Sequence, residues 1–546
     1  MGFVSFQHRH PVVAAIAGVA IVLMGIIVAL TGPSLIITYA KNRQLALRPS
    51  STSFDKWSNS EIKLKAYIFN ITNPADVHKN GSKPIVEEIG PFVYTAKQRK
   101  VDIKFRSEEE VEYRKTYKVY FERDLSVGDE SMEVTVLNAE MAAFLWKYRK
   151  EPPSLLAKSA VVVAMKREKY RGVFVKRTIK QLLHGHKGKL ARSTFQSRTA
   201  AFLVPLNNSV YPISVIGTGR TDFGQLNHLM GYDGHDHFPQ WSDPRCSKIP
   251  DDLRAEPNIG PDTPDDVTGV KLFLFWSRAM EFLLKEKRIP HKAHGYELEV
   301  NRFTSDPRFY DNGFDDPHHR CYDSDMISPD GYTKPKRKSN ESSGSGEEEE
   351  ETSTTGWETG FPSGVFDLSS IKEAPVLMSY PHFIHADPYF QQSIIGLKPD
   401  PSIHLSEWLI QPDTGVMAKF KNQFQINLAL QPNHRKIGLG FDAAPAIVYP
   451  MLWMEHETYL PESAAKKIHM ATRTVYPVCH ILAFLISCGG LLLLFLAVRS
   501  MLKSRRKGNI ADPINKYPSV KPQILQKANE TKVNQISDIP GPETDL

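Results

Sequence analysis

The residues best suited to do chemistry lie in one basic stretch, residues 166–192, which contains ten Lys or Arg side chains and a single acidic one. Clustered positive charge binds carboxylate and phosphate groups, and arginine adds bidentate hydrogen bonds. Lys166, Arg167, Lys169 and Arg171 are the candidates for contact with an anionic ligand. The alternative is a charged, solvated helix face that binds no ligand.

The chain shows no complete catalytic signature. The sequence from His456 begins like a zinc-protease motif, but Leu460 stands in place of the second histidine. Residues 438–443 imitate a dinucleotide-binding loop without the strand–helix–strand frame that such a loop needs. Residues 233–237 and 318–319 gather aspartate and histidine, but neither group has a third spaced metal ligand. We therefore expect no enzyme, no cofactor and no metal site.

Two long apolar runs frame the chain, and neither contains a charged side chain. Each exceeds the roughly 20 residues with which a helix crosses a bilayer. Five Lys or Arg follow the second run, so the positive-inside rule places both termini in the cytosol. We predict a cytosolic tail (1–10), a signal-anchor helix (11–37), an extracellular or lumenal ectodomain (38–474), a second transmembrane helix (475–498) and a cytosolic tail (499–546). The protein would then lie in the plasma membrane, the endosome–lysosome membrane, or both.

Positive charge is local in the ectodomain. The tails carry +5 of the formal net charge of +7, so the ectodomain nets +2 and, outside the basic stretch, about −7. A nucleic-acid-binding protein usually spreads basic charge over a broader face, so we expect no nucleic-acid partner. A compact basic patch on an acidic body instead steers anionic particles toward one place.

Covalent modification is expected in the ectodomain. Cys246 and Cys321 are its only cysteines, and an oxidising compartment would allow one disulfide between them. The sequence does not decide whether they meet. Four sequons for N-glycosylation lie at Asn70, Asn80, Asn207 and Asn340.

The ectodomain has the pattern of a mainly β protein with a helical insertion. Alternation of apolar and polar side chains, typical of antiparallel strands with one buried face, occurs at residues 101–105 and 424–430, and more loosely at 63–71 and 111–121. Alanine, leucine, methionine and lysine favour helix over residues 139–183 and again near residues 270–287.

One insert, at about residues 334–358, has almost no apolar side chains and is predicted to be disordered. A solvated loop is the simplest interpretation. The alternative is glycosaminoglycan attachment at Ser343 or Ser345, because each serine precedes glycine beside a run of five glutamates.

Several blocks of the ectodomain resemble the class B scavenger receptors, the fatty-acid translocase family, whose relatives include lysosomal integral membrane proteins and sensory neuron membrane proteins. Residues 177–185 resemble that family's R-T-x-x-E-L-L-W-G block, with Gln181 and His184 in place of Glu and Trp. The other blocks, in family order, are residues 64–74, 88–94, 364–369, 380–388, 412–415, 425–428 and 450–453.

The resemblance implies a fold and a place for the basic stretch. The expected fold is α+β and mainly β: a large antiparallel β-barrel ectodomain with an internal hydrophobic tunnel, a helical bundle cap and two transmembrane helices. The cap would lie at the apex, over about residues 139–190. Residues 165–171 would face the ligand there, whereas residues 177–183 would mainly hold the cap together. The family commonly has more ectodomain cysteines than this chain.

The C-terminal tail carries two short candidate motifs. Tyr517 and Val520 fit the Y-x-x-Φ pattern that adaptor complexes bind for endocytosis and lysosomal sorting. Thr544 and Leu546 fit a PDZ ligand, in which the terminal carboxylate enters a backbone nest and the peptide extends a sheet.

Three functions are compatible with this sequence. The first is a receptor for lipids, lipoproteins or anionic particles that passes lipid through its ectodomain tunnel to the membrane. The second is an endolysosomal sorting receptor for a protein cargo. The third is an adhesion protein that carries a glycosaminoglycan. The oligomeric state is left open.

Overall fold

The two apolar runs form two long helices, α2 (Pro11–Gln44) and α14 (Glu462–Ile510), in a computed structural model of the chain. Both are long and apolar enough to cross a membrane. The structure describes residues 10–49, 51–167, 172–186, 207–257, 260, 265–274, 278–311, 317–322, 329–330, 332, 361–372, 374–437, 439–440 and 442–510. The described chain forms two compact units, divided within α2 after Val28 and within α14 before Leu482.

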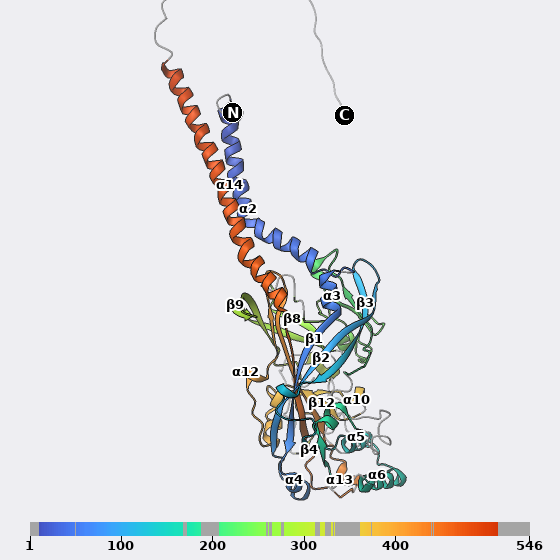
Figure 1. Cartoon of the computed structure of the whole chain (residues 1–546). Coiled ribbons are helices and arrows are strands. Elements are labelled where there is room, and N and C mark those ends of the chain that lie inside the picture. Colours follow the sequence, from blue (N-terminus) through green and yellow to red (C-terminus); the bar gives the residue numbers. More distant parts are fainter. Residues whose placement is uncertain are drawn as a thin grey trace, which may run out of the picture. The chain divides into compact units, whose positions relative to one another are not determined.

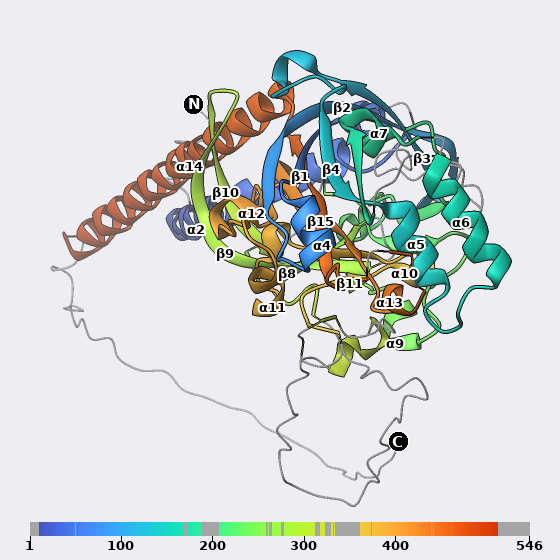
Figure 2. The same cartoon turned by 90° about the horizontal axis from the view of Figure 1, so that it is seen from below.

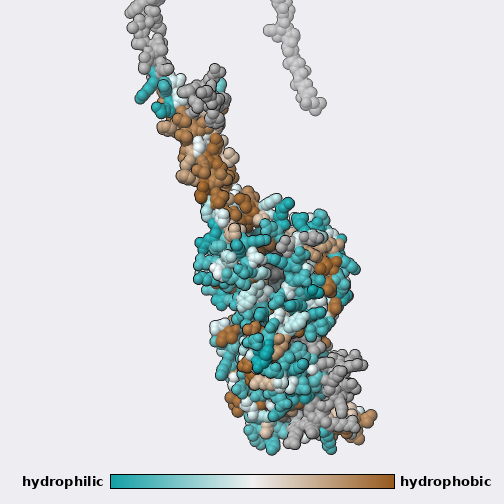
Figure 3. All heavy atoms as spheres, viewed as in Figure 1, coloured by the Kyte–Doolittle hydropathy of each residue, from teal (hydrophilic) through white to brown (hydrophobic). Residues whose placement is uncertain are grey.

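The smaller unit contains the outer parts of α2 and α14, which pack through small residues. A Cβ atom on Gly18 would lie 2.9 Å from the carbonyl oxygen of Gly490, and one on Gly25 would lie 2.2 Å from the Ser487 hydroxyl oxygen. Helices in a bilayer associate through such close backbone approach, because lipid offers no hydrophobic drive between them. Figure 3 shows their hydrophobic surface as a brown band.

The larger unit is built on a 13-stranded antiparallel sheet. Its main path runs β7-β6-β3-β2-β1-β15-β14-β13-β10-β9-β8, with β12 pairing β14 and β11 off that path (Figure 1). The strands are β1 (Asn59–Ile71), β2 (Val86–Phe105), β3 (Glu110–Phe121), β6 (Ser214–Gly217), β7 (Leu229–Tyr232), β8 (Gly269–Leu274), β9 (Arg278–Ala293), β10 (Tyr296–Ser305), β11 (Phe366–Asp367), β12 (Val376–Ser379), β13 (Glu407–Ile410), β14 (Met417–Ala429) and β15 (Val448–Tyr459). A separate two-stranded sheet pairs β4 (Glu133–Leu137) with β5 (Phe174–Thr178).

The sheet is nearly closed, as the family resemblance implies. Arg254 forms bridges with His228, just before edge strand β7, and with Leu272 of edge strand β8. Its amide donates to the Lys271 carbonyl, and the Phe273 amide donates to the Arg254 carbonyl. A short segment therefore covers the open edges, which protects their backbone groups from pairing with other chains.

Short helices are placed around this sheet. In Figure 1, α4, α5, α6 and α13 gather at one end of the unit, which we call the helical end, and α3 lies at the opposite end; Figure 2 looks at the helical end. The helices are α3 (Thr52–Ser58), α4 (Pro74–Asn80), α5 (Ala139–Lys147), α6 (Leu155–Arg167), α7 (Ile179–His184), α9 (Pro244–Ser247), α10 (Ser369–Lys372), α11 (Pro388–Ser393), α12 (Pro401–His404) and α13 (His434–Ile437). The 3₁₀ turns are η1 (Arg123–Leu125), η2 (Phe223–Gln225), η3 (Pro317–Tyr322) and η4 (Pro381–Phe383).

The strand segments and the early helical region expected from the sequence are confirmed, and one expected helix is wrong. The four alternating segments lie in β1, β2, β3 and β14, and the early helical region contains α5, α6 and α7, interrupted by β5. The helix expected near residues 270–287 is instead β8 and the start of β9. Met280 and Phe282 are buried and Glu281 is not, which is a period of two. Pairing of β9 with both β8 and β10 overrides the local preference of this apolar run for helix.

Distant family blocks meet in one partly buried polar network. The Glu88 carboxylate accepts hydrogen bonds from His382 Nε2 (2.6 Å) and Trp453 Nε1 (2.8 Å). The His382 amide donates to Gln425 Oε1 at 2.7 Å. The Lys398 amide donates to His382 Nδ1, so the ring proton is on Nε2. These four blocks of the sequence therefore specify the packing of β2, η4, β14 and β15.

The glycine of another block is required by its backbone. Gly364 has φ +96°, and a Cβ there would lie 2.2 Å from the Ala386 Cα. Gly295, in the β9–β10 hairpin, has a similar φ of +84° but nothing within 4 Å of its Cβ position. A substitution at Gly364 would therefore meet both backbone strain and a steric clash, whereas one at Gly295 would meet backbone strain alone.

We predict that Gly364→Ala lowers the free energy of unfolding by about 3 kcal/mol or more, because strain and overpacking add. Gly295→Ala should cost only about 1 kcal/mol from strain alone. Thermal unfolding of the purified full chain measures both. Equal losses for the two variants would contradict the assigned clash.

Candidate functional site

The three helices α5, α6 and α7 are fixed at the helical end by caps and buried apolar side chains. Asn138 Oδ1 caps α5 by accepting from the amides of Glu140 and Met141. Thr178 and Gln181 form a capping box at α7, with each side chain accepting from the other residue's amide. Gln181 therefore preserves the box that a glutamate would make.

Residues 177–183 of the basic stretch, expected to hold the cap together, pack their apolar side chains into the core. Ile179 and Leu183 of α7 are fully buried in the main core. His184 Nε2 lies 3.0 Å from Glu130 Oε1, which also accepts from the Tyr94 hydroxyl at 2.9 Å. The second departure from the family block thus places a histidine in a local hydrogen-bond network.

Of the four candidate ligand-binding cations, the structure places one side chain. Lys166 is exposed near the end of α6, whose Val161 and Met165 are buried against the core. Arg167 ends the helix, and its side chain is outside the described part of the chain, as are Lys169 and Arg171. The capture surface on these residues stays a prediction.

The structure adds two residues that sequence reasoning missed. Leu155 and Leu156, at the start of α6, are 83% and 82% exposed. Figure 3 shows a hydrophobic patch at the end of the unit where Figure 1 places α6. The sequence did contain a signal for this exposure: apolar residues occupy more than one face of the helix, and a single buried stripe cannot contain them all. Helix α6 therefore carries exposed leucines at its start and an exposed lysine near its end.

A cavity of about 140 Å³ lies inside the sheet. Its aromatic lining includes Trp57, Tyr117, Tyr211, Phe273 and Phe420. Lys56, Gln98, Lys115, Glu256 and His456 supply polar groups. The cavity is therefore mainly apolar with a few convergent polar groups, which is the usual character of a small-molecule site.

A larger cavity of about 700 Å³ lies where α2 ends and α14 begins, within the larger unit. Ile37 and Ala40 of α2 face Ile468 and Ala471 of α14 across it. Lys56, which follows α2 on α3, lines both cavities. The two cavities therefore share one lining residue, whose exposed side chain donates to the Ser463 hydroxyl at 3.1 Å.

A buried charge network forms one wall of the inner cavity. Glu256 accepts from Lys100 Nζ (3.0 Å) and from the Tyr113 hydroxyl (3.0 Å), and Lys115 Nζ lies 3.2 Å away. Burial raises the pKa of Glu256, but the two lysine charges outweigh burial and hold that pKa at about 2. Burial also lowers the pKa of Lys100 to about 8, against the opposing charge of Glu256. The wall therefore carries fixed charge at neutral and acidic pH.

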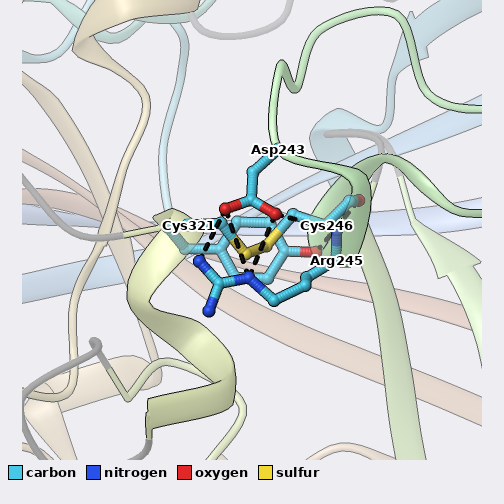
Figure 4. The surroundings of a disulfide bond; sticks show 5 residues. Asp243, Arg245, Cys246 and Cys321 are labelled. Carbon is cyan, nitrogen blue, oxygen red and sulfur yellow. Dashed lines mark hydrogen bonds and ion pairs between the residues drawn. A yellow bond between two sulfur atoms is a disulfide. The ribbon is translucent and has the colours of Figure 1, made fainter.

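Cys246 and Cys321 form a disulfide, which settles the pairing that the sequence left open. Their Cα atoms are 6.1 Å apart, and the bond joins α9 to η3 across 75 residues. Figure 4 shows the bond beside Asp243 and Arg245, whose side chains pair at 2.6 Å.

The predicted glycosylation sites differ in their surroundings. Asn80 is exposed at the end of α4. Asn70 and Asn207 use their Oδ1 atoms to accept from the amides of Thr135 (2.8 Å) and Val119 (3.1 Å). The remaining candidate residues lie outside the described part of the chain: Asn340, Ser343, Ser345, Tyr517, Val520, Thr544 and Leu546.

Comparison with known proteins places similarity along nearly the whole chain. The family model described as "CD36 family" matches residues 16–501. The chain is 25% identical to scavenger receptor class B member 1 of Rattus norvegicus over 511 residues, covering 90% of this chain and 89% of that protein. It is 26% identical to protein peste of Drosophila melanogaster, covering 87% and 81% of the two chains. Lysosome membrane protein 2 of Homo sapiens is 23% identical, with 84% and 88% covered.

The buried network yields a stability prediction. Glu256→Gln leaves two lysine charges beside the inner cavity, so we expect the free energy of unfolding to fall by about 3–5 kcal/mol. Thermal unfolding of the full chain measures the loss. Glu112→Gln removes a carboxylate from the exposed pair with Arg106 and should cost at most about 1 kcal/mol.

A double variant sharpens this test. Lys100→Met combined with Glu256→Gln should be more stable than Glu256→Gln alone, because the most buried unpaired charge is gone. A double variant as unstable as the single one would contradict the pairing.

Proposed function

The chain belongs to the CD36 family, and on that premise we propose that it is a class B scavenger-type membrane receptor, and not an enzyme. It binds lipids, lipoproteins or anionic particles at the helical end and passes lipid through the ectodomain to the membrane. The relatives named scavenger receptor class B member 1 support the receptor assignment.

The observation that carries the conduit is a pair of cavities that share Lys56 as a lining residue. The outer one is lined by apolar residues of the two long helices, among them Ile36, Ile37 and Ile468. A lipid chain needs an apolar path, and its polar end needs a few charged or hydrogen-bonding groups along that path. The inner cavity offers both.

The capture surface is proposed from two kinds of side chain on α6. Lys166, together with Arg167, Lys169 and Arg171, would attract anionic head groups. Leu155 and Leu156 would bury against the apolar surface of a particle, which stabilises contact by about 1.5–3 kcal/mol for each fully buried side chain. The positive charge would raise the rate of association, and the leucines would slow dissociation.

We predict that filling the outer cavity separates capture from transfer. Ala40→Trp should leave surface level and ligand binding unchanged and reduce lipid uptake severalfold, since a close-packed interior passes no chain. Thr38→Trp, on the exposed side of the same helix, is the matched control. Uptake in Ala40→Trp cells equal to that of the control would argue against a conduit here.

Capture itself is tested at the helical end. Leu155→Ser with Leu156→Ser should weaken binding of lipoprotein particles roughly tenfold or more. Changing Lys166, Arg167, Lys169 and Arg171 to Ala should weaken binding of anionic vesicles and make the remaining binding less sensitive to salt. Leu125→Ser with Val127→Ser, an apolar pair elsewhere that is 54% and 59% exposed, should bind as wild type does. Equal losses in that pair would point to misfolding instead.

The second candidate is an endolysosomal sorting receptor for a protein cargo. It is favoured by the similarity to lysosome membrane protein 2 and by the Tyr517–Val520 motif. An adaptor complex at Tyr517, and a PDZ protein at the C-terminus, are the cytosolic partners proposed. An adhesion protein carrying glycosaminoglycan is the third candidate.

Imaging of the tagged chain distinguishes the first two functions. If the motif sorts the protein, Tyr517→Ala should move it from endolysosomes to the cell surface. A cargo receptor should then missort one soluble enzyme while lipid uptake continues. Unchanged residence of Tyr517→Ala would remove the motif from the proposal.

A further inference from the structure

A third pocket, of about 330 Å³, lies beside the Cys246–Cys321 disulfide. It shares no lining residue with the two cavities of the proposed conduit. Arg245 and the disulfide contribute to one side of it, and Figure 4 shows these groups together. Its charged lining residues are Arg245, Lys248, Lys271, Arg278, Glu281, Asp306 and Arg308.

Arg278, at the first position of β9, is the unusual residue of this pocket. Its residue surface is only 4% exposed. The guanidinium carbon lies 4.2 Å from the ring centroid of Tyr322, 4.6 Å from that of Phe309 and 4.9 Å from that of Phe366. Its Nη1 and Nη2 atoms are buried without a hydrogen-bond partner, and no carboxylate of the described chain forms an ion pair with it.

Burial of an unpaired guanidinium is unfavourable. Three aromatic faces compensate in part, because their quadrupoles attract a cation, but they offer no acceptors for the N–H groups. Lys100, which is equally buried, has both the Glu256 carboxylate and the Trp57 carbonyl as acceptors. Burial lowers the pKa of Arg278 only to about 10, so the group keeps its charge at neutral and acidic pH.

Among the charged residues that line the pocket, the others leave this charge unbalanced; the Asp311 carboxylate, outside the lining, attracts Arg278 without forming an ion pair. Arg245 pairs with Asp243 (2.6 Å), Lys271 with Asp252 (3.1 Å) and Arg308 with Asp306 (3.1 Å). These three pairs are neutral as units. The remaining wall charges, those of Lys248 and Glu281, are opposite in sign and offset each other. The net positive charge of the pocket is therefore that of Arg278.

We propose that this pocket binds an oxyanion, namely a carboxylate, phosphate or sulfate group, held by the two terminal nitrogens of Arg278. The planar fork of arginine matches two oxygens of such a group, which lysine does not. The volume is at the lower end of the range for small-molecule sites, so the oxyanion is the end group of a small ligand. This site is independent of lipid capture and transfer.

The test uses the purified full chain in detergent. Its melting temperature is followed against phosphate, sulfate, acetate and glycerol 3-phosphate, each compared with chloride at equal ionic strength. At least one oxyanion should raise the melting temperature in a saturable way, because a ligand that binds the folded state stabilises it. Stronger stabilisation by glycerol 3-phosphate than by phosphate would identify an end group over a free ion.

Three variants assign the effect to Arg278. Arg278→Met should weaken apparent oxyanion affinity at least about tenfold, and without oxyanion it should melt no lower than wild type, since an unpaired buried charge is lost. Arg278→Lys keeps the charge without the fork and should bind with intermediate affinity. Arg106→Gln removes an equal charge from the exposed pair with Glu112 and should respond as wild type does.

Two results would overturn the proposal. One is a wild-type melting temperature that no oxyanion raises beyond chloride, which needs no variant and holds even if Arg278→Met fails to fold. The other is an Arg278→Met or Arg278→Lys chain with undiminished oxyanion affinity. Either would leave Arg278 as a cation held by aromatic rings alone.

Discussion

The pairing of the first strand of the large sheet with the last is the constraint on which the larger unit depends. Strand β1 follows α2 and α3, β15 precedes α14, and the two pair in antiparallel register. Lys65 Nζ lies 2.6 Å from Glu455 and 2.9 Å from Glu457, and the Tyr67 and Trp453 rings stack at 3.9 Å. This pairing brings the ends of α2 and α14 together around the outer cavity. The two ends of the larger unit's chain therefore lie close together.

The same closure explains how the family blocks act. Residues 64–74 and 450–453 are neighbours in the sheet, and Glu88, His382 and Gln425 meet beside them. A carboxylate that accepts from an imidazole and an indole joins two strands and one turn, and Gln425 adds a third strand through the His382 amide. Such a network specifies one packing arrangement because each unsatisfied member would be costly to bury. The residues of these blocks thus stabilise the fold, whereas ligand contact is proposed for side chains outside the blocks.

The part of the chain that the structure describes contains two kinds of buried positive charge, one with hydrogen-bond acceptors and one without. Beside the inner cavity, Lys100 and Lys115 share Glu256, which a tyrosine hydroxyl also satisfies. Beside the disulfide, Arg278 has aromatic faces but no acceptor for its terminal nitrogens in the described chain. The first arrangement is complete without a ligand, and the second has the donors of a binding site.

The two apolar helices, the strand-rich region between them and the position of the helical insertion could be predicted from the sequence, because they follow from local period and composition. The sequence-based prediction failed at residues 270–287, where pairing with strands on both sides decided for β structure. It did not reveal Leu155 and Leu156 as exposed, the Cys246–Cys321 bond or the setting of Arg278, because each depends on neighbours far away in the chain. Only the tertiary structure decided these, since burial and partners are properties of the packed chain.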